Sequence, residues 1–174
     1  MAVKNSSLGL SLLEVANVAT TGLPTTWEVL EDVKIGTANF TEDEGSTENI
    51  EIEQTDEIYR TITTKASVKK LTFELYDVSP DNLVKLKGGT VTPATASSGK
   101  IWNMGETSLD IFKSVRVTTK DGYKLIIANG HVKARITWPL SKSELATVLV
   151  EITVNKPKDT ALKSFTVEHP EKGI

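Results

Sequence analysis

The densest group of side chains that could do chemistry is a run of carboxylates in the first third of the sequence. Positions 42 to 57 contain eight acids and neither lysine nor arginine: Glu42, Asp43, Glu44, Glu48, Glu51, Glu53, Asp56 and Glu57. Carboxylates at this density could bind calcium, meet a basic surface on another subunit, or keep a strand edge soluble. The sequence lacks the Asp-x-Asp-x-Asp-Gly order of an EF-hand loop, which argues against calcium.

This acidic run makes the charge distribution uneven. Taking its eight acids from the 23 in the chain leaves fifteen, against 20 lysines and arginines, so the remainder is positively charged. Within the run, Ile50 and Ile52 alternate with Glu51 and Glu53, which predicts a strand with one apolar face. A solvated hairpin and an arm that contacts another subunit both remain open at this point.

A second charged feature is a short basic row, formed by His131, Lys133 and Arg135 on one face of a predicted strand. Lys69 and Lys70 could extend it. No aromatic residues interleave with these charges, as they do in single-strand nucleic-acid platforms, so a solvated sheet face is the simplest interpretation.

Residues for catalysis or metal binding are scarce. The chain has no cysteine, which excludes disulfides, Cys-ligated zinc and thiol nucleophiles. We expect its two histidines, His131 and His169, to be an exposed turn residue and an exposed tail residue, because neither has a partner at ligand spacing. Phosphate-loop, dinucleotide and nucleophile-elbow patterns are missing. We therefore expect neither an enzyme nor a cofactor.

Strands dominate the expected secondary structure. Alternation of apolar and polar residues predicts strands with one buried face at 71–75, 132–138 and 146–154, with Trp138 on the buried side of the second. Asp121-Gly122 and Asn129-Gly130 are expected to be two-residue hairpin turns, which gives a three-stranded meander from about 109 to 138.

That meander contains a conflict of register. If both loops have two residues, Val115 and Val117 share a face with Lys133 and Arg135. Either one loop carries an extra, bulged residue, or both faces of the sheet are partly covered.

One helix is expected, over residues 80–87. Ser79 is a suitable N-cap, Pro80 suits the first helical position, and Gly88 suits the stop. The chain is expected to be one domain over 1–174, with an N-terminal arm at about 1–22 and a C-terminal arm at about 156–174, where Leu162, Phe165 and Val167 could dock. No apolar run approaches the roughly 20 residues of a membrane-spanning helix.

The order of these parts is similar to that of a known family. A strand at 27–35 leads to a threonine- and acid-rich hairpin at 37–64, a long alternating strand at 64–78, the helix, the meander and a last strand before a tail. From about residue 23 to 156 the chain resembles the major tail tube proteins of long-tailed phages, which are related to the tube proteins of contractile tails and type VI secretion. The resemblance implies a mainly β fold of two packed antiparallel sheets, sandwich- or barrel-like, with one short flanking α-helix.

The resemblance also implies a function. Six copies would form a ring, and rings would stack into a tube through which DNA leaves the capsid, so the protein would be a homohexamer in the tail of a phage or prophage virion, assembled in the host cytoplasm. Residues 42–57 would form the hairpin that contacts the next ring or the lumen. Acidic walls repel phosphates, so DNA would pass without specific binding. Other tail proteins would be partners, and no membrane is involved.

Three alternatives stay open. The chain could be another tail or neck component, such as a terminator or a minor tail protein. It could be a monomeric β-sandwich binding module, for which Trp27, Trp102 and Trp138 are the available aromatic platform. It could also be a hydrolase that uses paired carboxylates.

Overall fold

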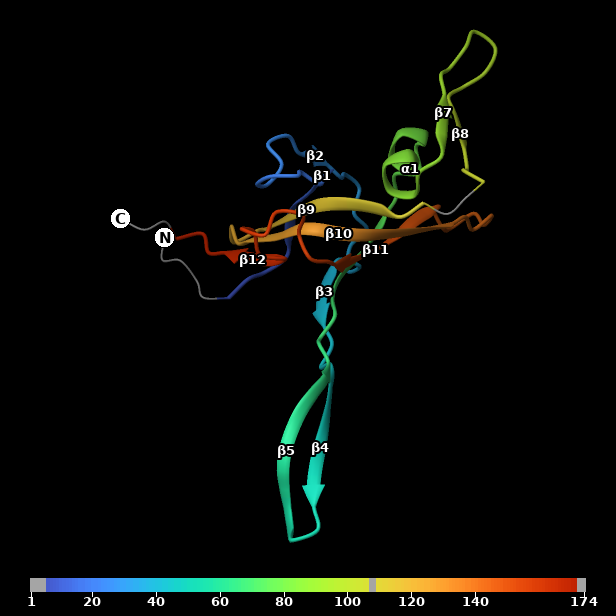
Figure 1. Cartoon of the computed structure of the whole chain (residues 1–174). Helices are drawn as coiled ribbons and strands as arrows, with labels where there is room; N and C mark the ends of the chain where they lie inside the picture. The colour runs from blue at the N-terminus through green and yellow to red at the C-terminus, as the bar shows by residue number, and fades with distance from the viewer. Residues whose placement is uncertain (1–5, 107–108, 172–174) are drawn as a thin grey trace.

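The computed structural model describes residues 6–106 and 109–171, and these form a mainly β protein with a single short helix (Figure 1). This confirms the expected fold class. The elements are, in order, β1 (Leu10–Asn17), β2 (Glu28–Val29), β3 (Asn39–Glu42), β4 (Ser46–Ile52), β5 (Thr55–Lys65), β6 (Lys69–Leu75), α1 (Pro80–Lys87), β7 (Thr90–Thr92), β8 (Ile101–Asn103), β9 (Ile111–Thr119), β10 (Lys124–Thr137), β11 (Thr147–Val154) and β12 (Phe165–Glu168).

Eight strands form one continuous antiparallel sheet in the order β2-β1-β9-β10-β11-β6-β3, with β12 also paired to β10. The segment after β2, residues 30–34, bonds both to β1 near one end of this strand order and to β6 near the other. The Leu30 amide donates to the Leu13 carbonyl of β1 at 2.8 Å, and Val33 forms a bridge with Leu75 of β6. The sheet therefore curls into a barrel-like form, and the two expected layers are opposite walls of one sheet.

A single core fills this curled sheet. Phe73, Leu75, Val148, Val150 and Ile152 have 0% exposed surface, which confirms the alternation predicted for 71–75 and 146–154. Helix α1 adds Leu83 and Leu86 to the same cluster. At the other side of the core, Phe40 of β3 stacks on Phe165 of β12 with ring centroids 4.4 Å apart.

Helix α1 begins and ends as predicted. The Ser79 hydroxyl accepts a hydrogen bond from the Asn82 amide at 3.4 Å, Pro80 occupies the first turn, and Gly88 caps the end with φ of 78°. The Trp102 indole then donates to the Gly88 carbonyl at 2.8 Å, which fixes the start of the β7–β8 hairpin on the helix.

The predicted hairpin turn at Asn129-Gly130 is wrong. Both residues lie inside β10, a single strand of 14 residues. One side of β10 pairs with β12 through Lys124–Ile127 and then with β11 through Gly130–Thr137, while β9 runs along the other side. The strand continues because three neighbouring strands supply its hydrogen bonds.

A bulge replaces the turn and resolves the conflict of register. Opposite β9, Ile127 pairs with Val115 whereas Gly130 pairs with Lys113, so β10 carries one extra residue between them. The bulge turns Lys133 to the outer face while leaving Ile127 and Val115 in the core.

The expected N-terminal arm at about 1–22 is wrong for Leu10–Asn17, which form β1 between β2 and β9. Leu13 and Val15 are 3% and 2% exposed. Glu14 interrupts this apolar stretch, but it is also buried, because Arg116 neutralises it. The part of the arm at residues 1–5 lies outside the described residues.

The C-terminal arm expected at about 156–174 is partly docked. Phe165–Glu168 form β12, which confirms the expected docking of Phe165. Upstream of β12, Asp159 accepts a hydrogen bond from the Gly22 amide at 2.8 Å. Residues 172–174 lie outside the described part of the chain.

Two β-hairpins project from this body on opposite sides, β4–β5 and the shorter β7–β8 (Figure 1). Across residues 6–106 and 109–171, no helix is both long and apolar enough to cross a membrane.

Candidate functional site

The acidic run predicted to be a hairpin is the β4–β5 hairpin. Its strands pair only with each other, with Asn49 opposite Thr61 and a 2.8 Å hydrogen bond between these two side chains. β5 has 11 residues, which at about 3.4 Å per residue span roughly 35 Å. Figure 1 shows the hairpin extending away from the sheet, so its far end is remote from the core.

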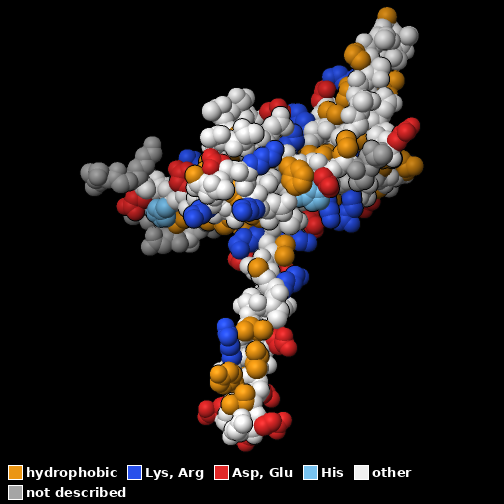
Figure 2. Space-filling view, viewed as in Figure 1, with side chains coloured by type: hydrophobic (Ala, Val, Ile, Leu, Met, Phe, Trp, Pro, Cys, Tyr) orange, Lys and Arg blue, Asp and Glu red, His pale blue; other side chains and the backbone are white. Residues whose placement is uncertain are grey.

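The far half of the hairpin exposes large apolar side chains. Ile50, Ile52, Ile58 and Tyr59 are 40%, 37%, 54% and 67% exposed, and we call these four residues the tip patch. Figure 2 shows hydrophobic side chains gathered on this part of the hairpin, with acids around them. Such contiguous apolar surface on a protrusion is typical of a protein-binding site. A two-stranded hairpin is also only marginally stable by itself in water, so contact with a partner would stabilise it.

Two of the eight acids hold the root of the hairpin. Glu42 lies 2.7 Å from the Lys69 ammonium and accepts a 2.5 Å hydrogen bond from the Ser67 hydroxyl. These bonds, that from Lys69 first, lower the pKa of Glu42 below its ordinary value. Asp43 exchanges two hydrogen bonds with Val68, one from its own amide at 3.1 Å and one to its carboxylate.

Glycine is required at the bend between β3 and β4. Gly45 has a φ of 54°, and a Cβ there would lie 2.5 Å from the Lys65 carbonyl oxygen. Both the left-handed conformation and the close approach of β5 exclude a side chain. The direction in which the hairpin leaves the sheet is therefore fixed at its base.

The other six acids form no ion pair among the described residues. They comprise Glu44 before β4, Glu48 and Glu51 in β4, Glu53 in the turn, and Asp56 and Glu57 in β5. All six are exposed. The described part of the chain contains no group of three or more His, Asp or Glu side chains that could hold a metal ion. Five of these six, Glu48, Glu51, Glu53, Asp56 and Glu57, thus lie in the same part of the hairpin as the tip patch.

The structure separates the three tryptophans proposed as an aromatic platform. Trp27 lies against the Arg116 guanidinium, with 4.6 Å to its ring centroid, and Trp102 is bonded to the end of α1. Trp138 lies beyond the end of β10 and is 58% exposed, so its predicted burial is wrong. The alternation that predicted it ends with the strand at Thr137.

His131 is also placed differently from the prediction. It lies within β10 rather than in a turn, its side chain is 22% exposed, and its Nε2 is 3.0 Å from Asp110 Oδ1. Phe112 packs against the ring at 5.3 Å. These partners are 21 and 19 positions away in sequence and become neighbours through the β9–β10 pairing, so no local spacing could reveal them.

Sequence reasoning missed the link between Glu14 and Arg116. The guanidinium donates two hydrogen bonds to the Glu14 carboxylate, at 2.6 and 2.8 Å. The only local signal was an acid within an apolar stretch. The pair fixes Trp27, and with it the segment that closes the sheet.

Comparison with known protein families matches no family model to this chain. Comparison with curated proteins likewise matches none of them.

Proposed function

We propose that this protein is a structural subunit of a phage or prophage tail tube, which assembles with copies of itself into stacked rings that conduct DNA. The observation that carries the proposal is the tip patch, four apolar side chains exposed at the end of a hairpin that packs on nothing else in the described chain. A monomer gains nothing from this arrangement, because the patch adds no core and exposes apolar surface to water.

Burial of the tip patch against another protein surface would be favourable in free energy. Full burial of a fully exposed Ile side chain contributes roughly 1.5–3 kcal/mol. The side chains of the tip patch are 37–67% exposed, so covering each one contributes part of that amount and offsets some of the entropy lost on association. The sequence around the patch is polar and threonine-rich, with Thr47, Thr61 and Thr63 on one face of the hairpin. That composition keeps the hairpin soluble before assembly and leaves the apolar residues to specify the contact.

The body suits a repeating assembly. The end strands of the sheet, β2 and β3, have two and four residues, and neither pairs on its outer side with another strand of the described chain. The likeness in the order of parts to tail tube proteins favours a hexameric ring, with other tail proteins as partners and the virion tail as location. Carboxylates that line a conduit would repel DNA phosphates and prevent sticking.

Electron microscopy and light scattering of the purified protein, over a range of concentrations, test this proposal. We expect rings or tubes from the wild type, and a shift to monomers when Ile50, Ile52 and Ile58 are replaced together by threonine. Ile101→Thr is the matched control, because Ile101 is a similarly exposed isoleucine (47%) on the other projecting hairpin. A wild-type protein that stays monomeric at high concentration, even with tail chaperones supplied, would overturn the proposal.

A further inference from the structure

The loop between β10 and β11 exposes a second group of large apolar side chains. Trp138, Leu140 and Leu145 are 58%, 94% and 68% exposed. β10 ends at Thr137 opposite Thr147 of β11, so all three lie in one short loop at one end of the sheet. None of them belongs to the core cluster or packs against it.

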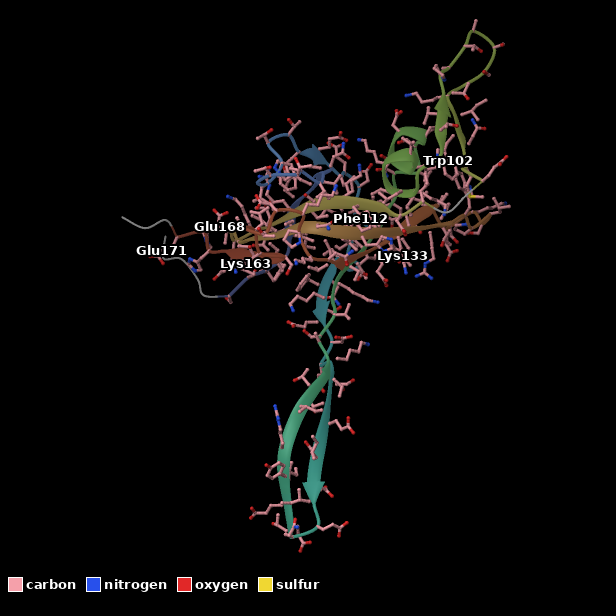
Figure 3. The ribbon with its side chains drawn as sticks, in the orientation of Figure 1. Trp102, Phe112, Lys133, Lys163, Glu168 and Glu171 are labelled. Atoms are coloured by element: carbon pink, nitrogen blue, oxygen red, sulfur yellow. The ribbon has the colours of Figure 1, made fainter. Side chains whose placement is uncertain are left out.

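Two unpaired cations lie on the strand that leads into this loop. Lys133 and Arg135 are exposed on the outer face of β10, and neither forms a hydrogen bond or ion pair with the described residues. The acid opposite Lys133, Glu151, is bonded instead to Lys70 of β6 at 3.4 Å. Figure 3 shows Lys133 at the opposite end of the sheet from Glu168 of β12, and Figure 2 shows basic side chains clustered at this end.

This end of the sheet and the tip patch are complementary. Each combines exposed apolar side chains with charges that form no ion pair among the described residues, and the net charges are opposite in sign: five carboxylates and Arg60 around the tip patch, Lys133 and Arg135 beside the loop. The loop itself also carries Lys142 and Glu144, whose charges cancel. An apolar centre with a charged rim is the usual composition of a protein interface, and opposite charges steer the two partners together.

The body of the same molecule does not supply a partner surface for the tip patch. The hairpin extends away from its own body and pairs only with itself, so its tip does not reach the loop of the same molecule. We propose that the tip patch of one copy docks on Trp138, Leu140, Leu145, Lys133 and Arg135 of the next. This inference rests on the proposed self-assembly and specifies its receiving surface.

The two surfaces are different, so the contact joins the copies head to tail. Each molecule that gives its hairpin to a neighbour still has its own β10–β11 loop available. A contact of this kind propagates into rings or filaments, whereas a contact between identical surfaces would stop at a two-fold dimer.

Charge reversal tests the pairing of the two surfaces. One variant carries Lys133→Glu with Arg135→Glu, and another carries Glu51→Lys, Glu53→Lys, Asp56→Lys and Glu57→Lys, which makes the tip positive even with Glu48 unchanged. Each alone has like charges on both surfaces, and we expect the concentration at which it assembles to rise at least about tenfold. An equimolar mixture of the two variants restores opposite charges at every contact, so we expect assembly at close to the wild-type concentration.

Disulfide trapping gives an independent measurement, because the natural chain has no cysteine. A double variant with Ile58→Cys and Leu140→Cys should form a ladder of linked oligomers on oxidation. The control pairs Ile58→Cys with Ile101→Cys, where we expect no ladder.

The outcomes separate this inference from the proposed function. If the wild type assembles but reversal at Lys133 and Arg135 has no effect, the receiving surface is overturned and self-assembly stands. If the folded wild type does not assemble at all, both are overturned. Circular dichroism of each variant checks that it is folded.

Discussion

The Arg116 guanidinium of β9 donates two hydrogen bonds, of 2.6 and 2.8 Å, to the Glu14 carboxylate of the neighbouring strand β1. Trp27 covers the guanidinium from outside. The pair makes it possible for a carboxylate that is only 7% exposed to lie in the same strand as Leu13 and Val15. It thus joins a core strand to the segment that closes the sheet.

Removing Arg116 should therefore destabilise the fold. Arg116→Ala leaves Glu14 largely buried without its partner, and we expect the free energy of unfolding to fall by about 2–3 kcal/mol. Arg116→Lys keeps the charge but loses the paired geometry, so a smaller loss is expected. Urea denaturation measures both, and equal stability of Arg116→Ala and the wild type would contradict this account.

The same pair predicts how stability depends on pH. The hydrogen bonds from Arg116 outweigh burial and lower the pKa of Glu14 below its ordinary value of 4.5. The stabilisation is thus fully present above pH 4.5 and is lost as the pH falls through the lower pKa of the folded protein.

The difference between wild type and Glu14→Gln isolates this effect, because the other acids with lowered pKa values, Glu28, Glu42 and Asp159, are common to both. Thermal melts between pH 6 and about pH 3 should show the advantage of the wild type shrinking with acidification. An advantage that stays constant over this range would contradict the prediction.

Gly130 tests the bulge in β10. A Cβ at this position would lie 2.4 Å from Ile152 Cγ2, inside the fully buried core. We expect Gly130→Ala to cost about 1–3 kcal/mol, as overpacking of a core usually does. Gly99→Ala is the control, because a Cβ there meets nothing within 4 Å. If Gly130 were in an exposed hairpin turn instead, the two variants would have similar stability.

Gly45 tests the base of the hairpin. Gly45→Ala combines a left-handed conformation with an overlap on the Lys65 carbonyl, so the β3–β4 bend should shift. We expect faster amide exchange in β4 and β5 and weaker assembly, while the melting temperature of the body changes little, because the hairpin lies outside the core.

Gly22→Ala provides the comparison for the Gly45 experiment. Gly22 has a similar φ, 67°, but open space around it, so its replacement carries strain of about 1 kcal/mol without the overlap. Hairpin exchange should then stay at the wild-type rate. Equal effects of the two variants on the hairpin would show that the overlap at Gly45 is unimportant.

Local patterns in the sequence determined several elements correctly. The alternation around Phe73 and Val150 predicts two core strands, because every second side chain of a strand faces the same side. Ser79 and Gly88 bound the helix, because capping is satisfied within a few residues of each helix end. The acids and isoleucines at 42–57 predict a hairpin, and β4 and β5 form one that exposes Ile50, Ile52 and Ile58.

Only the tertiary structure decided the rest. Asn-Gly suits a two-residue turn, but at Asn129-Gly130 three neighbouring strands bond β10 and keep it continuous. The sequence predicts an arm at about 1–22, but Arg116, 102 positions away from Glu14, neutralises this acid and allows 10–17 to form a core strand. In both places the local conformational preference contributes about 1 kcal/mol or less to the free energy of folding. Hydrogen bonds with residues distant in sequence contribute more and therefore decide the structure.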